Sequence, residues 1–188
     1  MPSPVLARVP RANMPPSLQA AHDAALKLRD DATFIEVAAN APELMDWYVK
    51  EFYGRVFYAG RVEVRTKELL RYRLSMMHGC AYCNRGNSAA ARKAGVSEAQ
   101  LERVMDENDA VFDARDRAVL KLASQVAMTN PGGHLDAALH AELRAHFDDA
   151  QIFELGMTAG MLTGMAKFLF VYDLVEREAA CPYGPPRH

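Results

Sequence analysis

Signals for β-strands are almost absent from this sequence, and that absence restricts the fold more than any other feature. No Asn-Gly or Asp-Gly pair separates alternating polar and apolar runs, so tight β-hairpins are not indicated. Apolar residues recur instead at intervals of three and four, which is the period of an amphipathic helix. Helices are predicted over 17–29, after Asp31, over 43–58, 67–77 and 80–94, after Ser97, and over 113–128, 135–147 and 152–172. The sequence therefore predicts an all-α fold with about eight helices.

Polar residues that commonly begin helices support these boundaries. Thr66 is expected to cap the helix over 67–77, and Ser97 with Gln100 matches a capping box. Asp148 or Asp149 is expected to cap the long apolar helix. Gly79 interrupts the helical pattern immediately before Cys80, which places the cysteine at the start of the next helix.

No linker divides the 188 residues, of which 50% are hydrophobic, so a single domain with a real core is expected. Residues 1–15 are predicted to form an extended N-terminal arm, 16–180 the helical domain and 181–188 an irregular tail. The first residues lack the apolar core of a secretory signal, and we expect a cytoplasmic protein.

Charge and hydropathy exclude other classes of partner. The net charge of -2 shows no basic surplus, which argues against nucleic acid and against an anionic membrane surface. The apolar run over 152–172 is about as long as a bilayer span, but it contains Glu154 and Lys167. We therefore expect a buried helix there and no membrane.

The chain has three cysteines, too few for a disulfide framework, and two of them form a Cys80-x-x-Cys83 motif. Two cysteines three residues apart at a helix start lie on one face, close enough to form a disulfide. The helix dipole favours a thiolate there, and the second sulfur can resolve an adduct formed on the first. A metal site or two inert buried thiols are the alternatives, and remote Cys181 has no assigned role.

Glu68 lies twelve residues before Cys80, in the preceding helix. If the two helices pack as a hairpin with its turn at His78 and Gly79, the carboxylate returns towards Cys83. A carboxylate at that distance can relay protons, directly or through water. The alternative is a first-turn glutamate that only stabilises its own helix.

The window from Glu68 to Asn87 resembles the core of the carboxymuconolactone decarboxylase and AhpD-like alkylhydroperoxidase superfamily, over about 64–126. The family's pattern is Glu, eleven residues, Cys-x-x-Cys, three residues, His, and Glu68, Cys80 and Cys83 match it. The resemblance implies that Cys83 attacks peroxide, that Cys80 resolves and that Glu68 relays protons. It also implies a homo-oligomer and no bound organic cofactor. The histidine position is occupied by Asn87, for which His78 and Tyr82 are the nearby partial substitutes.

The hypothesis favoured by these residues is a thiol-dependent peroxidase or disulfide oxidoreductase, weakened by Asn87. Its partners would be a small hydroperoxide or disulfide substrate and an external dithiol reductant, with no metal. A lyase or decarboxylase that acts on a small cyclic acid or lactone through Glu68 and His78 is the alternative. A non-catalytic, redox-sensing oligomer is the third. The aromatic-rich stretch over 47–58 is expected to line a subunit interface or the substrate entrance.

Overall fold

The computed structural model describes residues 2–184. Over this range the chain forms nine α-helices, a short 3-10 helix and a π-helix, without a β-strand, which confirms the all-α prediction. The predicted tail over 181–188 is described only to Gly184, and it is irregular up to that residue. The helices are α1 (Pro16–Arg29), α2 (Thr33–Ala38), α3 (Pro42–Trp47), α4 (Val64–His78), α5 (Ala81–Lys93), α6 (Glu98–Arg103), α7 (Ala114–Val126), α8 (Ala137–Arg144) and α9 (Asp149–Val171). The 3-10 helix is η1 (Arg11–Asn13) and the π-helix is η2 (Tyr48–Tyr58).

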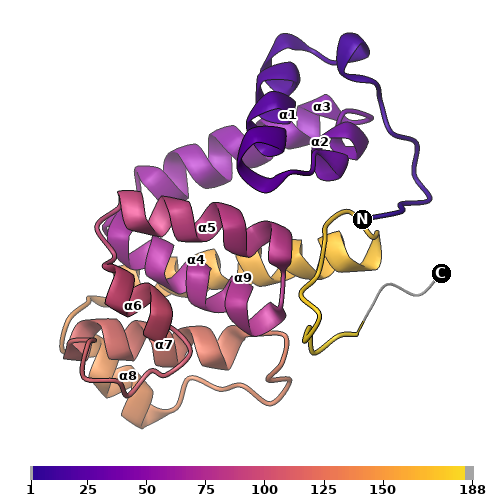
Figure 1. Ribbon diagram of the computed structural model, residues 1–188. Coiled ribbons are helices and arrows are strands. Elements are labelled where there is room, and N and C mark those ends of the chain that lie inside the picture. Colours follow the sequence, from indigo (N-terminus) through magenta and orange to yellow (C-terminus); the bar gives the residue numbers. More distant parts are fainter. Residues whose placement is uncertain (1, 185–188) are drawn as a thin grey trace.

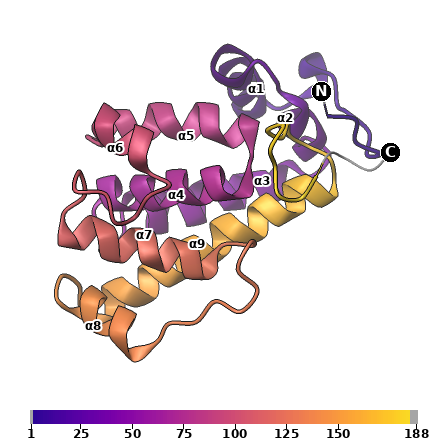
Figure 2. The same ribbon diagram turned by 60° about the horizontal axis from the view of Figure 1, so that its bottom comes forward.

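Helix α4 is the centre of the fold. It packs against α5, α7 and α9. Helix α8 in turn packs against α7 and α9. Helices α1–α3 gather at one end of the molecule and α6–α8 at the other (Figures 1 and 2). The largest apolar cluster fills the space between α4, α7, α8 and α9, with Leu70, Leu74, Leu122 and Leu155 among its members.

Helix α4 is buried on nearly all sides, so its charged residues need partners inside the protein. Lys67, which is fully buried, donates to Glu154 of α9 at 3.0 Å and to the carbonyl of Val56 at 2.8 Å. Arg73 donates to Glu107 at 2.9 Å. These pairs fix the position of α4 between its neighbours, and they stabilise the fold only while both partners remain.

The N-terminal segment lies close to the end of α9 (Figure 2). The backbone N–H of Ser3 donates to Asp173 at 2.8 Å, and the N–H of Val9 donates to the carbonyl of Glu36 at 3.0 Å. Residues 2–15 contain only the short η1 turn and otherwise run along α2 and the end of α9. Among residues 2–184, no helix is long and apolar enough to cross a membrane.

Several helix ends are as predicted, and others are not. Capping boxes form at Ser97 with Gln100 and at Asp148 with Gln151. The prediction that Thr66 caps a helix from residue 67 is wrong, because α4 already begins at Val64. The Thr66 hydroxyl instead donates back to Glu63 at 3.0 Å, inside the first turn.

Candidate active site

The turn between α4 and α5 is built around Gly79. Helix α4 ends at His78, and Gly79 adopts a left-handed conformation with φ of 66°, which glycine accepts without steric cost. A Cβ atom at Gly79 would lie 2.7 Å from the Cα atom of Cys181. The sharp turn and the close approach of the C-terminal segment both require glycine, and together they set Cys80 at the start of α5.

Cys80 and Cys83 form a disulfide, with their Cα atoms 5.2 Å apart. Cys80 is the N-cap residue of α5, and its Sγ accepts a hydrogen bond from the backbone N–H of Cys83 at 3.2 Å. Cys80 is completely buried, whereas Cys83 is partly exposed. The two sulfurs therefore differ: Cys83 is the more accessible, and Cys80 receives the free N–H of the helix start.

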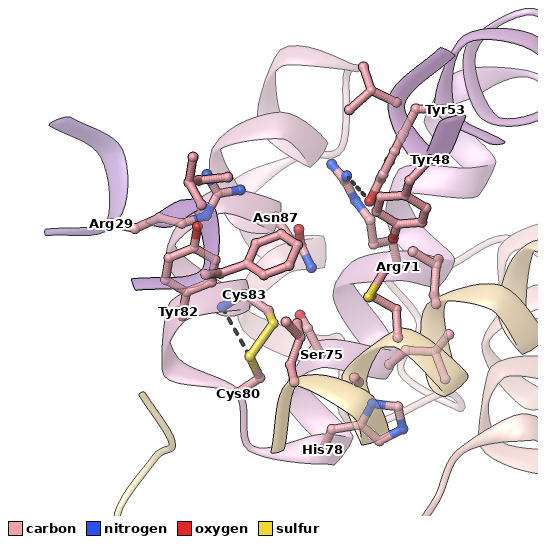
Figure 3. Close-up of a pocket in the computed structure, with 18 of the residues that line it drawn as sticks. Arg29, Tyr48, Tyr53, Arg71, Ser75, His78, Cys80, Tyr82, Cys83 and Asn87 are labelled. Atoms are coloured by element: carbon pink, nitrogen blue, oxygen red, sulfur yellow. Dashed lines mark hydrogen bonds between the residues drawn. A yellow bond between two sulfur atoms is a disulfide. The ribbon is translucent and has the colours of Figure 1, made fainter. Parts of the chain in front are cut away.

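The disulfide lies in the wall of a cavity of about 380 Å³ (Figure 3). Its lining is mostly apolar and aromatic, and comes from α1–α5, η2 and α9. Apart from four tyrosines, the polar residues and cysteines of the lining are Arg29, Arg71, Ser75, His78, Cys80, Cys83 and Asn87. The volume lies in the lower part of the range of small-molecule sites.

Three of those tyrosines owe their positions to the π-helix. In η2 hydrogen bonds run from residue i to i+5, so residues five apart lie on one face. Tyr48, Tyr53 and Tyr58 recur at that interval and all line the cavity. The predicted α-helix over 43–58 would have put Trp47 on the buried stripe, but Trp47 is 54% exposed. Trp47 is the last residue of α3 and precedes the π-helix.

Glu68 lies next to the cavity but not in its lining. Its Oε2 accepts from Nη2 of Arg71 at 2.5 Å, and it is Arg71 that reaches the cavity, where its Nη1 lies 3.4 Å from the Tyr53 hydroxyl. Burial raises the pKa of the Glu68 carboxyl, and the Arg71 charge only partly offsets this. Among residues 2–184, no hydrogen bond joins Glu68 to either cysteine.

His78 lines the cavity as a neutral imidazole. It is 1% exposed, and its Nε2 accepts from the backbone N–H of Met128 at 3.2 Å. Burial lowers its pKa to about 4. The occupied Nε2 and the low pKa both make His78 a poor proton donor near neutral pH.

Asn87 and Tyr82 reach the same cavity from α5. In Figure 3, Asn87 projects between Tyr82 and Arg71, above the disulfide. Burial raises the pKa of the Tyr82 hydroxyl. The Arg29 guanidinium, from the end of α1, lies over the Tyr82 ring at 4.9 Å from its centroid. The structure thus places His78, Cys80, Tyr82, Cys83 and Asn87 around one cavity, with Glu68 behind Arg71.

The C-terminal segment after α9 covers the back of the disulfide. The N–H of Glu178 donates to the carbonyl of Gly79 at 2.9 Å, and the N–H of Tyr82 donates to the carbonyl of Glu176 at 3.3 Å. Cys181 is a free, buried thiol whose Sγ donates to the carbonyl of His78 at 3.3 Å. The segment supports the turn from outside the cavity, and Cys181 is not part of the lining.

The two arginines were not found from the sequence, whereas the aromatic stretch over 47–58 was expected at a subunit interface or the substrate entrance, and its three tyrosines line the cavity. Arg71 could have been found, because it follows Glu68 by three residues and that spacing brings the two side chains together on a helix. Arg29 could not have been found, because α1 is far from the cysteines in sequence and only tertiary packing brings it to α5.

Residues 42–125 match the model of the carboxymuconolactone decarboxylase family. Over these residues, which are less than half of the chain, the sequence is similar to that family. The match confirms the resemblance and extends it beyond the predicted 64–126 to include α3 and η2, so the tyrosines of the π-helix lie within the family's segment.

One sequence relative is the uncharacterized protein YdfG of Bacillus subtilis (strain 168), which is 30% identical over 91 residues. That alignment covers 48% of this chain and 61% of YdfG, so the chain spans less than two thirds of that relative.

Solved structures share the fold. The debrominase Bmp8, in complex with 2,3,4-tribromopyrrole, has a TM-score of 0.74 at 15% identity and covers 96% of this chain and 95% of its own. A peroxidase-related AhpD-core protein from Ralstonia eutropha JMP134 has a TM-score of 0.73 at 14% identity over 100% of both chains. An Agrobacterium tumefaciens protein of unknown function, a candidate AhpD antioxidant defence protein, reaches 0.64 at 24% identity and covers 72% of this chain and 91% of its own. At these identities the likeness concerns the fold alone.

Proposed function

We propose that this chain is a thiol-dependent peroxidase or disulfide oxidoreductase that uses Cys80 and Cys83 as its redox pair. The observation that carries the proposal is the disulfide at the start of α5, set in the wall of a cavity with one accessible and one buried sulfur. Similarity to the carboxymuconolactone decarboxylase family over residues 42–125 and to solved AhpD-like folds supports it.

In the proposed reaction the accessible Cys83 attacks and the buried Cys80 resolves. The Cys83 thiolate attacks one oxygen of a hydroperoxide, the O–O bond breaks, and the released alkoxide takes a proton to become an alcohol. The Cys83 sulfenic acid is then attacked by the Cys80 thiolate, which forms the disulfide and releases water after protonation. An external dithiol supplies the two electrons that return the pair to thiols.

Of the steps in the proposed reaction, proton exchange is the one that the residues of the site support least. Asn87 occupies the family's histidine position, and an amide does not exchange protons near neutral pH. Glu68 is the proposed relay, because a pKa raised by burial allows a carboxyl to hold a proton closer to neutral pH. Arg71 stands between Glu68 and the cavity and cannot release its proton, so the exchange has to pass through water in the cavity.

A homo-oligomer in a reducing compartment such as the cytoplasm remains our proposal for the assembly and location. Along α9 the side chains of Phe153, Met157 and Val171 are 71%, 51% and 65% exposed. Apolar side chains that gather on one face mark interaction sites, and a second copy of the chain is the proposed occupant.

A lyase acting through Glu68 and His78 receives less support from the site. Glu68 is held by Arg71, and the Nε2 of His78 already accepts from Met128. Reductive dehalogenation of a small aromatic ring is the second candidate, favoured by the aromatic lining of the cavity. There the dithiol would supply two electrons, so that a carbon–halogen bond becomes a carbon–hydrogen bond, halide leaves and the disulfide forms.

The experiment compares single cysteine variants of the full chain. Peroxide-dependent oxidation of a dithiol is followed at steady state, and the Cys80–Cys83 link is sought by mass spectrometry after mild peroxide. Cys83→Ser is expected to abolish turnover, and Cys80→Ser to leave a sulfenic acid on Cys83 that a dimedone probe traps. Cys181→Ser is the matched control and should keep turnover. Turnover that survives Cys83→Ser rejects the mechanism, and a disulfide formed once without sustained turnover indicates redox sensing instead.

A further inference from the structure

All of the charge in the lining of the cavity is positive. Two charged side chains line it, Arg29 from α1 and Arg71 from α4, and no aspartate or glutamate is among its lining residues within the described chain. The rest of the wall is apolar or aromatic, apart from Ser75, Asn87 and the neutral His78. A cavity with low-dielectric walls and net positive charge attracts anions more strongly than the same charges would in water.

The two arginines are not equivalent. Arg71 is 8% exposed, and its charge is compensated by Glu68 at 2.5 Å. Arg29 has no such partner: none of the ion pairs formed within residues 2–184 includes it. Its buried Nε atom also lacks a hydrogen-bond partner there. Arg29 is therefore the cation of the cavity that is still available to an anion.

The position of Arg29 is fixed by two neighbours on α5. Its guanidinium lies over the ring of Tyr82, and it occupies the space that a side chain at position 86 would fill. A Cβ atom on Gly86 would lie only 2.1 Å from Nη2 of Arg29. Tyr82 immediately precedes Cys83, so the group that holds Arg29 also adjoins the accessible sulfur (Figure 3).

We propose that the cavity binds a small, mainly apolar or aromatic carboxylate, with its carboxylate group on Arg29. A guanidinium matches a carboxylate through two parallel N–H···O bonds, and the apolar wall accommodates the remainder of the molecule. This part of the inference rests on the reaction proposed above. Its substrate is then a hydroperoxide or disulfide that carries a carboxylate. Binding of the carboxylate itself does not depend on the redox chemistry.

The test measures binding to the oxidised full chain by calorimetry, with 3-phenylpropanoate as the probe and 3-phenylpropanamide as its neutral isostere. The wild-type protein is expected to bind the acid at least tenfold more tightly than the amide, and the preference should fall as salt is added. Arg29→Met keeps the apolar stem and removes the charge. It should weaken binding of the acid at least tenfold and leave binding of the amide unchanged.

Two further variants keep the result interpretable. Arg29→Lys should restore part of the preference for the acid, and thermal unfolding reports whether each variant is folded. Arg85→Met is the matched control, because Arg85 lies on α5 outside the cavity and pairs with Glu176 at 2.7 Å. Equal binding of acid and amide, no binding of either, or a loss in Arg85→Met as large as in Arg29→Met would overturn the proposal.

Steady-state assays separate this inference from the proposed function. The Arg29→Met variant should raise KM for a carboxylated hydroperoxide much more than it changes KM for neutral cumene hydroperoxide. Turnover of both substrates without a preference for the acid overturns the inference and leaves the peroxidase intact. Tight binding of the acid by a protein without peroxidase activity supports the carboxylate site and rejects the reaction.

Discussion

Acidification between pH 7 and pH 5 tests how the fold holds His78. Burial lowers the pKa of His78 to about 4, against the ordinary histidine value of 6.5 that applies in the unfolded chain. Between these two values the unfolded chain binds more protons than the folded one, so stability falls as pH falls from 6.5 towards 4. Protonation at Nε2 would also remove the acceptor for the Met128 N–H.

The size of the effect follows from the two pKa values. The full difference corresponds to about 3 kcal/mol, and about 2 kcal/mol of it is lost between pH 7 and pH 5. With a urea m-value of about 2 kcal/mol/M, the midpoint of unfolding should fall by about 1 M between those two pH values. Carboxylates with lowered pKa values, such as Glu36 and Glu154, contribute mainly below this window, and Glu68 contributes with the opposite sign.

The assay is urea unfolding followed by circular dichroism at pH 7 and pH 5. His78→Gln keeps a hydrogen-bond acceptor for Met128 but does not titrate, so its midpoint should change much less between the two pH values. His146→Gln, at an exposed histidine, should behave as the wild type does. The reasoning is refuted if the wild-type midpoint is the same at both pH values, or if His78→Gln retains the full loss.

Two further predictions concern the turn and the proton relay. Gly79→Ala should cost about 2 kcal/mol or more, because it adds a Cβ at a positive φ and 2.7 Å from the backbone of Cys181. Gly132→Ala, at a loop glycine without a positive φ and with nothing within 4 Å of its added Cβ, should instead stabilise the protein by up to about 1 kcal/mol; thermal unfolding measures both. Asn87→His should raise peroxide-dependent turnover at least tenfold, within the usual range for a general acid–base group, and should add a titration near pH 6.5 to the rate profile. An unchanged rate would show that the residue at position 87 does not limit the reaction.

Local signals were sufficient to predict much of the fold. The capping box at Ser97 and the cap at Asp148 are short-range hydrogen bonds between neighbours in sequence, and such contacts survive in the folded protein. The turn at Gly79 was found for the same reason, because a glycine between two helical patterns requires no tertiary contact to act as a stop. The position of Cys80 at the start of α5 followed directly from that turn.

The residues missed depend on packing instead of local sequence. The π-helix cannot be distinguished from an α-helix by apolar spacing over one short segment, so the common face of Tyr48, Tyr53 and Tyr58 was not visible. Arg29 reaches the cavity only because α1 packs on α5 and position 86 has no side chain. Glu68 was expected to return towards Cys83, but its carboxylate pairs with Arg71 and lies outside the lining of the cavity, an ion pair that was not foreseen.

The two sulfurs have different surroundings, and this difference indicates which chemical step the site favours. In the disulfide a backbone N–H donates to the sulfur of Cys80, and in the proposed reduced state the same N–H would stabilise a Cys80 thiolate, whereas Cys83 is the sulfur that a substrate can reach. Resolution, in which Cys80 attacks an adduct on Cys83, therefore has a stabilised nucleophile already adjacent to its target. The first attack has no comparable support, because position 87 carries an amide and Arg71 is held by Glu68. An anionic substrate bound by Arg29 would be held next to Cys83. Positioning of this kind can accelerate a step whose nucleophile is weakly activated.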